Sequence, residues 1–361
     1  MAFYKFTDIR IMGMAVAIPG NIVSLKEFES ALGREAVEKF RENSSTDLVH
    51  VALRSQTASD LGFIAAKELL RINNIDKDNI GFVVFISRTP DYRSPATATV
   101  LHYRLALPQD CIAFDINQGG TGFFHGLQIG CSLLQSVNKG YGIIILGDTP
   151  SKELSPSDPA NLILGDCASA IILEKVPGSG EICVQTGTCS EKFRSFYISG
   201  GGFRKMNMKK EVPERNNDFP VTQDNLYIDW AEFLSFANGE MEDHINGFLE
   251  ECNRSLVDYN LIVNSGFYNM ETEILRMNTL ENKTATQNIV SNTINYSGST
   301  VPYYLINSII NKPDSDFHVF GTGYGEGLSW GLADFHIASR NLIPLIKSDK
   351  IFEEGFVSHD F

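Results

Sequence analysis

The sequence predicts an α/β protein built from two similar halves. Strand-like and helix-like segments alternate along its 361 residues, which is typical of layered α/β folds. The two strongest strand candidates, Gly81–Ser87 and Tyr141–Asp148, are apolar runs without alternation, so each is expected to be buried on both faces. A predicted helix at roughly 122–137 is apolar nearly all round, so we expect it to lie between layers.

The first half, taken as residues 1–175, shows these signals most clearly. Residues 9–18 are predicted to form a strand, and Ser24 is expected to cap a following helix. Residues 57–72 have the apolar spacing of an amphipathic helix, with Ser59 or Asp60 near its start. A further helix is expected after Pro95.

The second half, residues 176–361, repeats the pattern less cleanly. A polar, glycine-containing stretch at about 199–225 is predicted to be a long loop or cap between the halves. The remaining predicted elements are a helix at 229–254, a strand at 261–263, a helix after Glu271, a helix after the loop 295–302 and a strand at 318–320.

Charge and composition exclude several classes of protein. The 30 basic and 44 acidic side chains give a net charge of −14, which disfavours nonspecific nucleic-acid binding. No apolar run reaches the roughly 18 residues of a membrane-spanning helix. The N-terminus lacks the basic-then-apolar pattern of a secretion signal, so we expect a cytoplasmic location. The six cysteines lie singly, without metal-ligand spacing, and are interpreted as reduced, buried thiols.

The segment 113–127 is predicted to be a strand that turns directly into the apolar helix. A turn of this kind can hold a nucleophile at a helix N-terminus, where unpaired backbone N–H groups favour negative charge. Here the turn, Gln118-Gly119-Gly120-Thr121, contains no thiol.

Several motifs together resemble those of the β-ketoacyl-acyl-carrier-protein synthase III family of the thiolase superfamily. They are Thr89–Ala98, Ala113–Asn117, Leu164–Ala170, Asn295 and Gly325–Gly331. The resemblance implies a thiolase-like fold of five layers, α-β-α-β-α, and a dimer formed through the first half. It also implies a Claisen condensation, in which a cysteine takes an acyl group while a histidine and an asparagine assist decarboxylation of a malonyl carrier-protein thioester.

The resemblance places Gly120 at the position of the cysteine. Glycine cannot form an acyl-enzyme, and the nearest thiol, Cys131, lies about three helical turns further along. Thr121 is the adjacent hydroxyl. We interpret it as bonding the first helical turn in preference to acting as a nucleophile, because nothing near it in the sequence looks like its base.

The histidine position is also changed. Depending on register, Ser265 or Gly266 takes it, and neither can be a cationic donor near neutral pH. Asn295 matches the family asparagine, where it either donates to a carbonyl or caps the following helix.

Glu326 stands where the family has a small residue whose backbone N–H helps to bind the thioester oxyanion. Either it is a new acid or base whose pKa is raised by burial, or its side chain faces solvent or pairs with an arginine. The segment 39–46 lacks the family's coenzyme A clamp.

The leading hypothesis is therefore a synthase-III-like protein without condensing activity, acting as the partner of an active paralogue in a fatty-acid-like or polyketide-like pathway. The alternative is an enzyme that uses Glu326 and Asn295 for acyl transfer, hydrolysis or decarboxylation of a thioester. A third reading has no activity and no partner. We expect a homodimer or heterodimer, an acyl-carrier-protein or coenzyme A thioester as ligand, and no metal or tightly bound cofactor.

Overall fold

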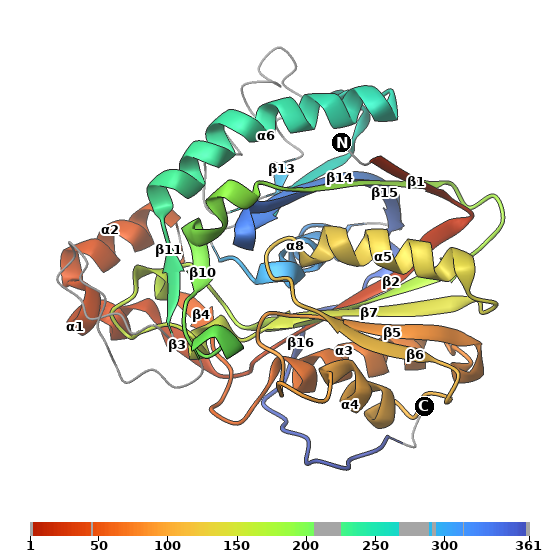
Figure 1. The fold of residues 1–361 in the computed structure, drawn as a ribbon, viewed down its shortest axis with the longest axis horizontal. Helices are drawn as coiled ribbons and strands as arrows, with labels where there is room; N and C mark the ends of the chain where they lie inside the picture. The colour runs from red at the N-terminus through yellow and green to blue at the C-terminus, as the bar shows by residue number, and fades with distance from the viewer. Residues whose placement is uncertain are drawn as a thin grey trace.

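The computed structural model describes residues 3–358, apart from 45, 206–224, 267–288, 291–293 and 313. Figure 1 shows two sheets with helices below, between and above them, so the expected order of five layers is confirmed. The lower sheet contains, from edge to edge, β16 (Ile346–Lys347), β2 (Ile9–Ile18), β8 (Cys167–Lys175), β7 (Tyr141–Asp148), β5 (Ile80–Ile86) and β6 (Ile112–Ile116).

The upper sheet also has six strands among the described residues. They are β1 (Phe3–Thr7), β9 (Glu181–Thr188), β15 (Ser329–Ala338), β14 (Asp316–Gly325), β12 (Leu261–Asn264) and β13 (Ile289–Val290). Strand β1 belongs to the first half of the chain and β16 to the second, so each end of the chain adds a strand to the sheet formed mainly by the other half.

Three layers of helices separate and cover the sheets. The lower layer is α3 (Ala58–Ile72) and α4 (Thr97–Arg104), the middle layer is α5 (Gly122–Ser136) and α8 (Thr300–Ile309), and α6 (Trp230–Cys252) covers the upper sheet (Figure 1). A smaller unit at one side contains β3 (Ile22–Ser24), β4 (Leu48–His50), β10 (Phe196–Ile198), β11 (Leu226–Ile228), α1 (Glu29–Leu32) and α2 (Arg34–Ser44).

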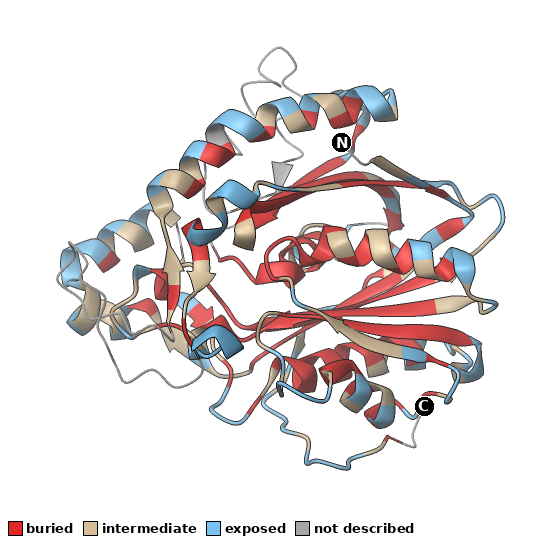
Figure 2. Cartoon of the chain, in the orientation of Figure 1, coloured by how far each residue is buried: buried red, intermediate tan, exposed pale blue. Residues whose placement is uncertain are grey.

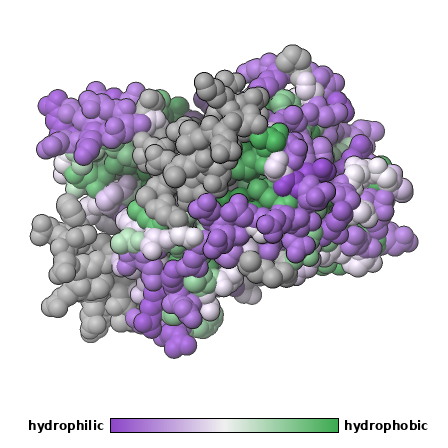
Figure 3. All heavy atoms as spheres, turned by 90° about the horizontal axis from the view of Figure 1, so that it is seen from above, coloured by the Kyte–Doolittle hydropathy of each residue, from purple (hydrophilic) through white to green (hydrophobic). Residues whose placement is uncertain are grey.

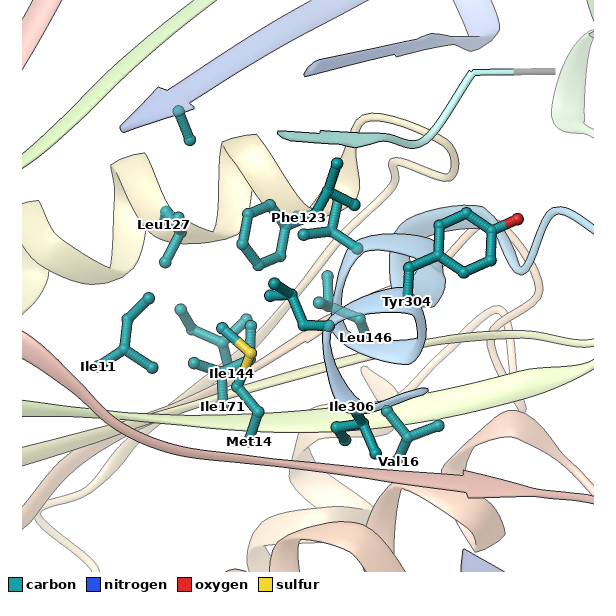
Figure 4. Close-up of a cluster of buried hydrophobic side chains, with 14 of the residues drawn as sticks. Ile11, Met14, Val16, Phe123, Leu127, Ile144, Leu146, Ile171, Tyr304 and Ile306 are labelled. Carbon is teal, nitrogen blue, oxygen red and sulfur yellow. The ribbon is translucent and has the colours of Figure 1, made fainter. Parts of the chain in front are cut away.

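The core lies between the middle helices and the sheets. Phe123 and Leu127 of α5 point towards Met14 and Ile144 of the lower sheet in Figure 4, and all four are fully buried or nearly so. Figure 2 shows the same pattern, with buried residues through both sheets and exposed residues on the outer helix faces. Glycine on α5 allows close packing, because a Cβ added at Gly126 would lie 2.8 Å from the side chain of Ile86.

The face seen from above is hydrophilic around its edge, with apolar side chains nearer its middle (Figure 3). Among the described residues, no helix is both long and apolar enough to cross a membrane. All six cysteines are free thiols; four are buried, while Cys189 and Cys252 are partly exposed.

Most predicted elements of the first half are confirmed. The apolar runs form β5 and β7, and the helix predicted at 122–137 is α5. The helix predicted at 57–72 is α3, and Ser59 and Asp60 lie in its first turn: Thr57 is its N-cap, and the Asp60 carboxylate accepts the Thr57 backbone N–H at 3.0 Å in a capping box. Most of the predicted cap at 199–225 and the helix after Glu271 lie outside the described residues.

Candidate functional site

The candidate site is built on the turn between β6 and α5. Strand β6 is fixed on its outer side by Asp115, whose carboxylate accepts the backbone N–H groups of Thr97 at 2.6 Å and Ala98 at 2.7 Å, at the N-terminus of α4. These charge-assisted bonds satisfy two of the unpaired N–H groups of that helix. The turn itself therefore begins from a rigid strand.

The carboxylate of Glu326 lies against this turn. Its Oε2 accepts the backbone N–H of Gly120 at 2.9 Å, next to the N-terminus of α5. A Cβ added at Gly119 would lie 2.2 Å from Oε1 of Glu326. A Cβ added at Gly120 would lie 3.0 Å from the carbonyl oxygen of Tyr324 and 3.2 Å from Cα of Gly325. Space beside the turn is therefore filled by the Glu326 carboxylate and by the backbone that carries it.

A short chain of hydroxyl bonds fixes Glu326 at the end of the β14–β15 hairpin. Ser329 Oγ donates to the carbonyl oxygen of Glu326 at 2.9 Å, and it lies 2.7 Å from Thr121 Oγ1. Thr121 also donates to the side chain of Gln118 at 3.2 Å. Its hydroxyl is thus bonded, as expected, but to Gln118 and Ser329 and not to the first helical turn. The reason is that the β14–β15 hairpin brings the Ser329 hydroxyl to 2.7 Å from Thr121 Oγ1.

Arg88 is the partner that the sequence analysis missed. It follows the C-terminal end of β5, and its guanidinium donates through Nη1 to Glu326 Oε1 at 3.0 Å. Its Nη2 lies 3.2 Å from Oε2 of a second carboxylate, Glu153. The exposed fractions of the three side chains are only 9% for Arg88, 15% for Glu153 and 20% for Glu326. Glu326 is therefore paired with an arginine, as one of the two interpretations predicted, but it is not turned out to solvent.

A signal for Arg88 is present in the sequence. A charged residue directly follows a buried parallel strand, and in α/β sheets the carboxyl ends of such strands are where functional groups gather. No comparable signal marks Glu153, which lies in the polar segment after β7 and follows the short 3₁₀ helix Pro150–Lys152.

Carboxylates outnumber cations at this site. Burial raises the pKa of Glu153 to about 7, with the negative charges of Asp148 and Glu326 adding to the effect and Arg88 opposing it. Burial also raises the pKa of Asp148, which is fully enclosed. Asp148 accepts the Ser297 hydroxyl at 2.5 Å and the Arg88 backbone N–H at 2.9 Å. With a pKa of about 7, Glu153 can bind and release a proton near neutral pH.

Beside these charges lies a cavity of about 390 Å³. Its polar lining includes Arg88, Glu153, Glu326 and Gly119. Its apolar and aromatic lining is Phe193, Phe196, Tyr197, Ile198 and Leu226. A ligand here would meet apolar surface together with the carboxylates and the guanidinium, which is the usual composition of a small-molecule pocket.

Asn295 and Ser265 lie together, but neither lines this cavity. The Asn295 amide Nδ2 donates to the backbone carbonyl of Ser265 at 2.7 Å, and its Oδ1 accepts the backbone N–H of Ser297 at 2.7 Å. The Ser265 hydroxyl donates to the carbonyl of Thr322 at 3.2 Å. Within the described part of the chain, no hydrogen bond or ion pair joins this pair to Glu326.

The structure therefore divides the sequence-predicted residues into two groups. Gly120 and Glu326 are in direct contact, and Ser265 and Asn295 are in direct contact. In the ranges that the structure describes, no cluster of three His, Cys, Asp or Glu side chains has an arrangement suited to a metal ion. Gly120 and Glu326, together with Arg88 and Glu153, can hold a proton and a fixed negative charge at the N-terminus of α5.

Comparison with known proteins relates this chain to one group of enzymes. The family model described as 3-oxoacyl-[acyl-carrier-protein (ACP)] synthase III matches residues 114–190, which include the site turn. A putative 3-oxoacyl-[acyl-carrier-protein] synthase 3 of Campylobacter jejuni is 28% identical over 350 residues, covering 91% of this chain and 94% of the relative. A beta-ketoacyl-[acyl-carrier-protein] synthase III of Clostridium perfringens is 27% identical over 334 residues, covering 90% and 98%.

Solved structures give the same fold. A 3-oxoacyl-(acyl-carrier protein) synthase from Burkholderia xenovorans aligns with a TM-score of 0.84 at 23% identity, covering 96% of this chain and 99% of that one. FabH from Pseudomonas aeruginosa aligns with a TM-score of 0.74 at 21% identity. The chain therefore has the thiolase-like fold of these synthases, and its sequence is similar to theirs over about nine tenths of its length.

Proposed function

We propose that this synthase-III-like chain does not catalyse a cysteine-dependent condensation and acts as the non-catalytic partner of an active condensing subunit. The pathway would be a fatty-acid-like or polyketide-like one, in the cytoplasm, in which the ligand is an acyl-carrier-protein or coenzyme A thioester. No tightly bound cofactor is part of the proposal.

One observation carries the proposal: the Glu326 carboxylate is bonded to the Gly120 N–H at the N-terminus of α5. The motif resemblance places Gly120 at the position of the family cysteine, and glycine offers no side chain. A thioester oxyanion stabilised at the same place would stand near a fixed negative charge. Two charges about 4 Å apart repel by roughly 4 kcal/mol at an effective dielectric constant of 20. That repulsion is as large as the roughly 2.7–4 kcal/mol that one oxyanion-hole hydrogen bond contributes.

The contact between Asn295 and Ser265 also supports the absence of condensing activity. Asn295 uses both ends of its amide within the backbone of its own loop and of Ser265. Its role in the structure is to tie β12 to the loop before α8. The family's decarboxylating site has a histidine beside this asparagine, and the described residues at the end of β12, Asn264, Ser265 and Gly266, supply no titratable nitrogen.

A partner surface is available on the first half. Strand β6 is at the edge of the lower sheet and pairs only with β5 among the described residues. Ile112 on this strand is 44% exposed. A free strand edge with apolar side chains is suited to pairing with another chain, so we propose dimerisation here, either with a second copy or with an active paralogue.

The test is co-purification followed by assay. The chain is expressed alone and together with the product of the neighbouring gene, and each preparation is incubated with an acyl thioester and malonyl carrier protein. We expect a stable heterodimer, no ketoacyl product from this chain alone, and no acyl adduct on it by mass spectrometry. Recovery only as a homodimer that releases ketoacyl product would refute the proposal.

The alternative, non-covalent thioester processing, is favoured by one observation. Glu153 has a pKa of about 7 and lines the same cavity as Glu326, so a proton donor and acceptor is present without a cysteine. If the chain hydrolyses or decarboxylates thioesters, Glu326→Gln abolishes turnover and Glu153→Gln removes its pH dependence near neutrality. Unchanged turnover in both variants would exclude this alternative.

A further inference from the structure

A second cavity lies on the opposite side of the lower sheet from Gly120. It is formed between α3 and the C-terminal tail, residues 342–358, and has a volume of about 720 Å³. Figure 1 shows the chain leaving β16 and passing beneath the helices of the lower layer towards the C-terminus. We call this cavity the tail groove. Neither the proposed function nor the site at Gly120 requires it.

Polar bonds hold the outer wall of the tail groove in place. Gln56 Nε2 donates to the backbone carbonyl of Lys350 at 3.1 Å, and Arg104 donates through Nη2 to that of Phe352 at 3.1 Å. Arg104 is itself paired with buried Asp60 at 3.1 Å. The groove is therefore formed before any ligand binds, so binding does not include the entropy loss of ordering the tail.

The lining of the tail groove is largely apolar. Its walls include Phe63, Ile64, Ile72, Ile343, Ile346 and Phe356. Ile72 is 51% exposed and Phe356 is 37% exposed, so hydrophobic surface remains open to solvent there. In Figure 2 the tail is mostly exposed whereas the sheet-facing side of α3 is buried. Covering this surface with an apolar chain would remove it from water.

Three of the four charged residues that line the tail groove are lysines. They are Lys67, Lys347 and Lys350, although the whole chain has a net charge of −14. The fourth, Glu68, is bonded to Arg71 at 2.6 Å. The other carboxylates of the tail, Asp349, Glu353 and Glu354, are not among the lining residues. The lining therefore offers a ligand's negative head group more partners than it offers a cationic one.

We propose that the tail groove binds a single-chain fatty carboxylate, with its acyl chain on the apolar walls and its carboxylate among the lysines. The volume lies within the range of roughly 300–1,000 Å³ that is usual for small-molecule sites. The complementarity of three lysines to one carboxylate, together with the open apolar walls, selects this class of ligand over a neutral or cationic one.

The test uses the full chain and dodecanoate below its micelle concentration, with calorimetry as the measurement. We expect one binding event, and decanoate is expected to bind at least tenfold more weakly, because each methylene contributes about fourfold. Dodecyltrimethylammonium has the same chain and the opposite charge, and it is expected to bind at least tenfold more weakly than dodecanoate. Equal binding of the cationic probe would overturn the proposal.

Variants locate the binding site. The double substitution Lys347→Glu with Lys350→Glu is expected to weaken dodecanoate binding at least tenfold while the unfolding midpoint stays the same, because both side chains are exposed. Lys26→Glu, an exposed lysine outside the groove, is the matched control and should bind as the wild type does. Unchanged affinity in the double variant would refute the site. So would recruitment to phosphatidylglycerol vesicles without any binding of monomeric dodecanoate, which would indicate a membrane surface instead.

Discussion

Glu153→Gln provides the sharpest test of the charge arrangement around Arg88. Burial raises the pKa of Glu153 from 4.5 to about 7 in the folded protein, so the folded state holds this proton more tightly than the unfolded state does. A raised carboxyl pKa makes a contribution to stability that is fully present below pH 4.5 and is lost as the pH rises through 7.

The size of the effect follows from the shift. A difference of about 2.5 units corresponds to roughly 3 kcal/mol, at about 1.4 kcal/mol per unit. At pH 5 part of this contribution has already been lost. Between pH 5 and pH 8 the free energy of unfolding of the wild type should therefore fall by about 2 to 3 kcal/mol through this group alone. Glutamine cannot titrate. The free energy of unfolding of the Glu153→Gln variant should therefore rise relative to that of the wild type by this amount over the same interval.

Urea unfolding at pH 5, 6, 7 and 8 measures the difference directly. The matched control is Glu35→Gln, which removes an exposed carboxylate on α2 and should leave the pH profile parallel to that of the wild type. Parallel curves for Glu153→Gln and the wild type would show that Glu153 is ionised in the folded state at pH 5. The conclusion that burial and an excess of carboxylates around Arg88 raise the pKa of Glu153 would then be wrong.

Two further substitutions probe the same contacts. Arg88→Met leaves two partly buried carboxylates unpaired and should lower the free energy of unfolding by about 3 to 5 kcal/mol at pH 8, and by less at pH 5. The control is Arg34→Met, at an exposed ion pair, which should change the free energy of unfolding by less than about 1 kcal/mol in urea unfolding. Equal losses in the two variants would contradict the pairing. Gly119→Ala places a Cβ against the Glu326 carboxylate and should lower the free energy of unfolding by about 1 to 3 kcal/mol, measured by thermal unfolding. The control Gly202→Ala places its Cβ in open space and should leave the stability nearly unchanged. An unchanged stability in Gly119→Ala would mean that the Glu326 carboxylate is not held there.

The sequence alone was sufficient to predict those elements that are continuous apolar runs. The runs that became β5 and β7 are apolar at every position that must face a helix layer, and α5 is apolar on both of the faces that contact sheets. The strand-to-helix turn before α5 followed from small residues between two such runs. These signals are local, so no knowledge of distant partners was needed.

The contacts that define the site were beyond local reasoning. Arg88 and Glu326 are separated by 238 positions and Gly120 and Glu326 by 206. Nothing in a sequence pattern states which of several arginines faces which carboxylate, because that depends on how the two sheets stack around α5. The same limit applies to Asn295, which was expected to act with Glu326, whereas its amide is bonded to the backbone of Ser265 and Ser297.

The position of Glu326 also makes the residues around it depend on one another. Gly119 leaves the space that the carboxylate occupies, and Arg88 balances the charge that the carboxylate brings to the helix N-terminus. A cysteine placed at position 120 would press its Cβ against the Tyr324 carbonyl and would present its thiol beside a negative group, which raises a thiol pKa. A nucleophile at this turn would thus require the Glu326 loop to move or to lose its charge, so the glycine at position 120 and the glutamate at position 326 are best understood as a single structural unit.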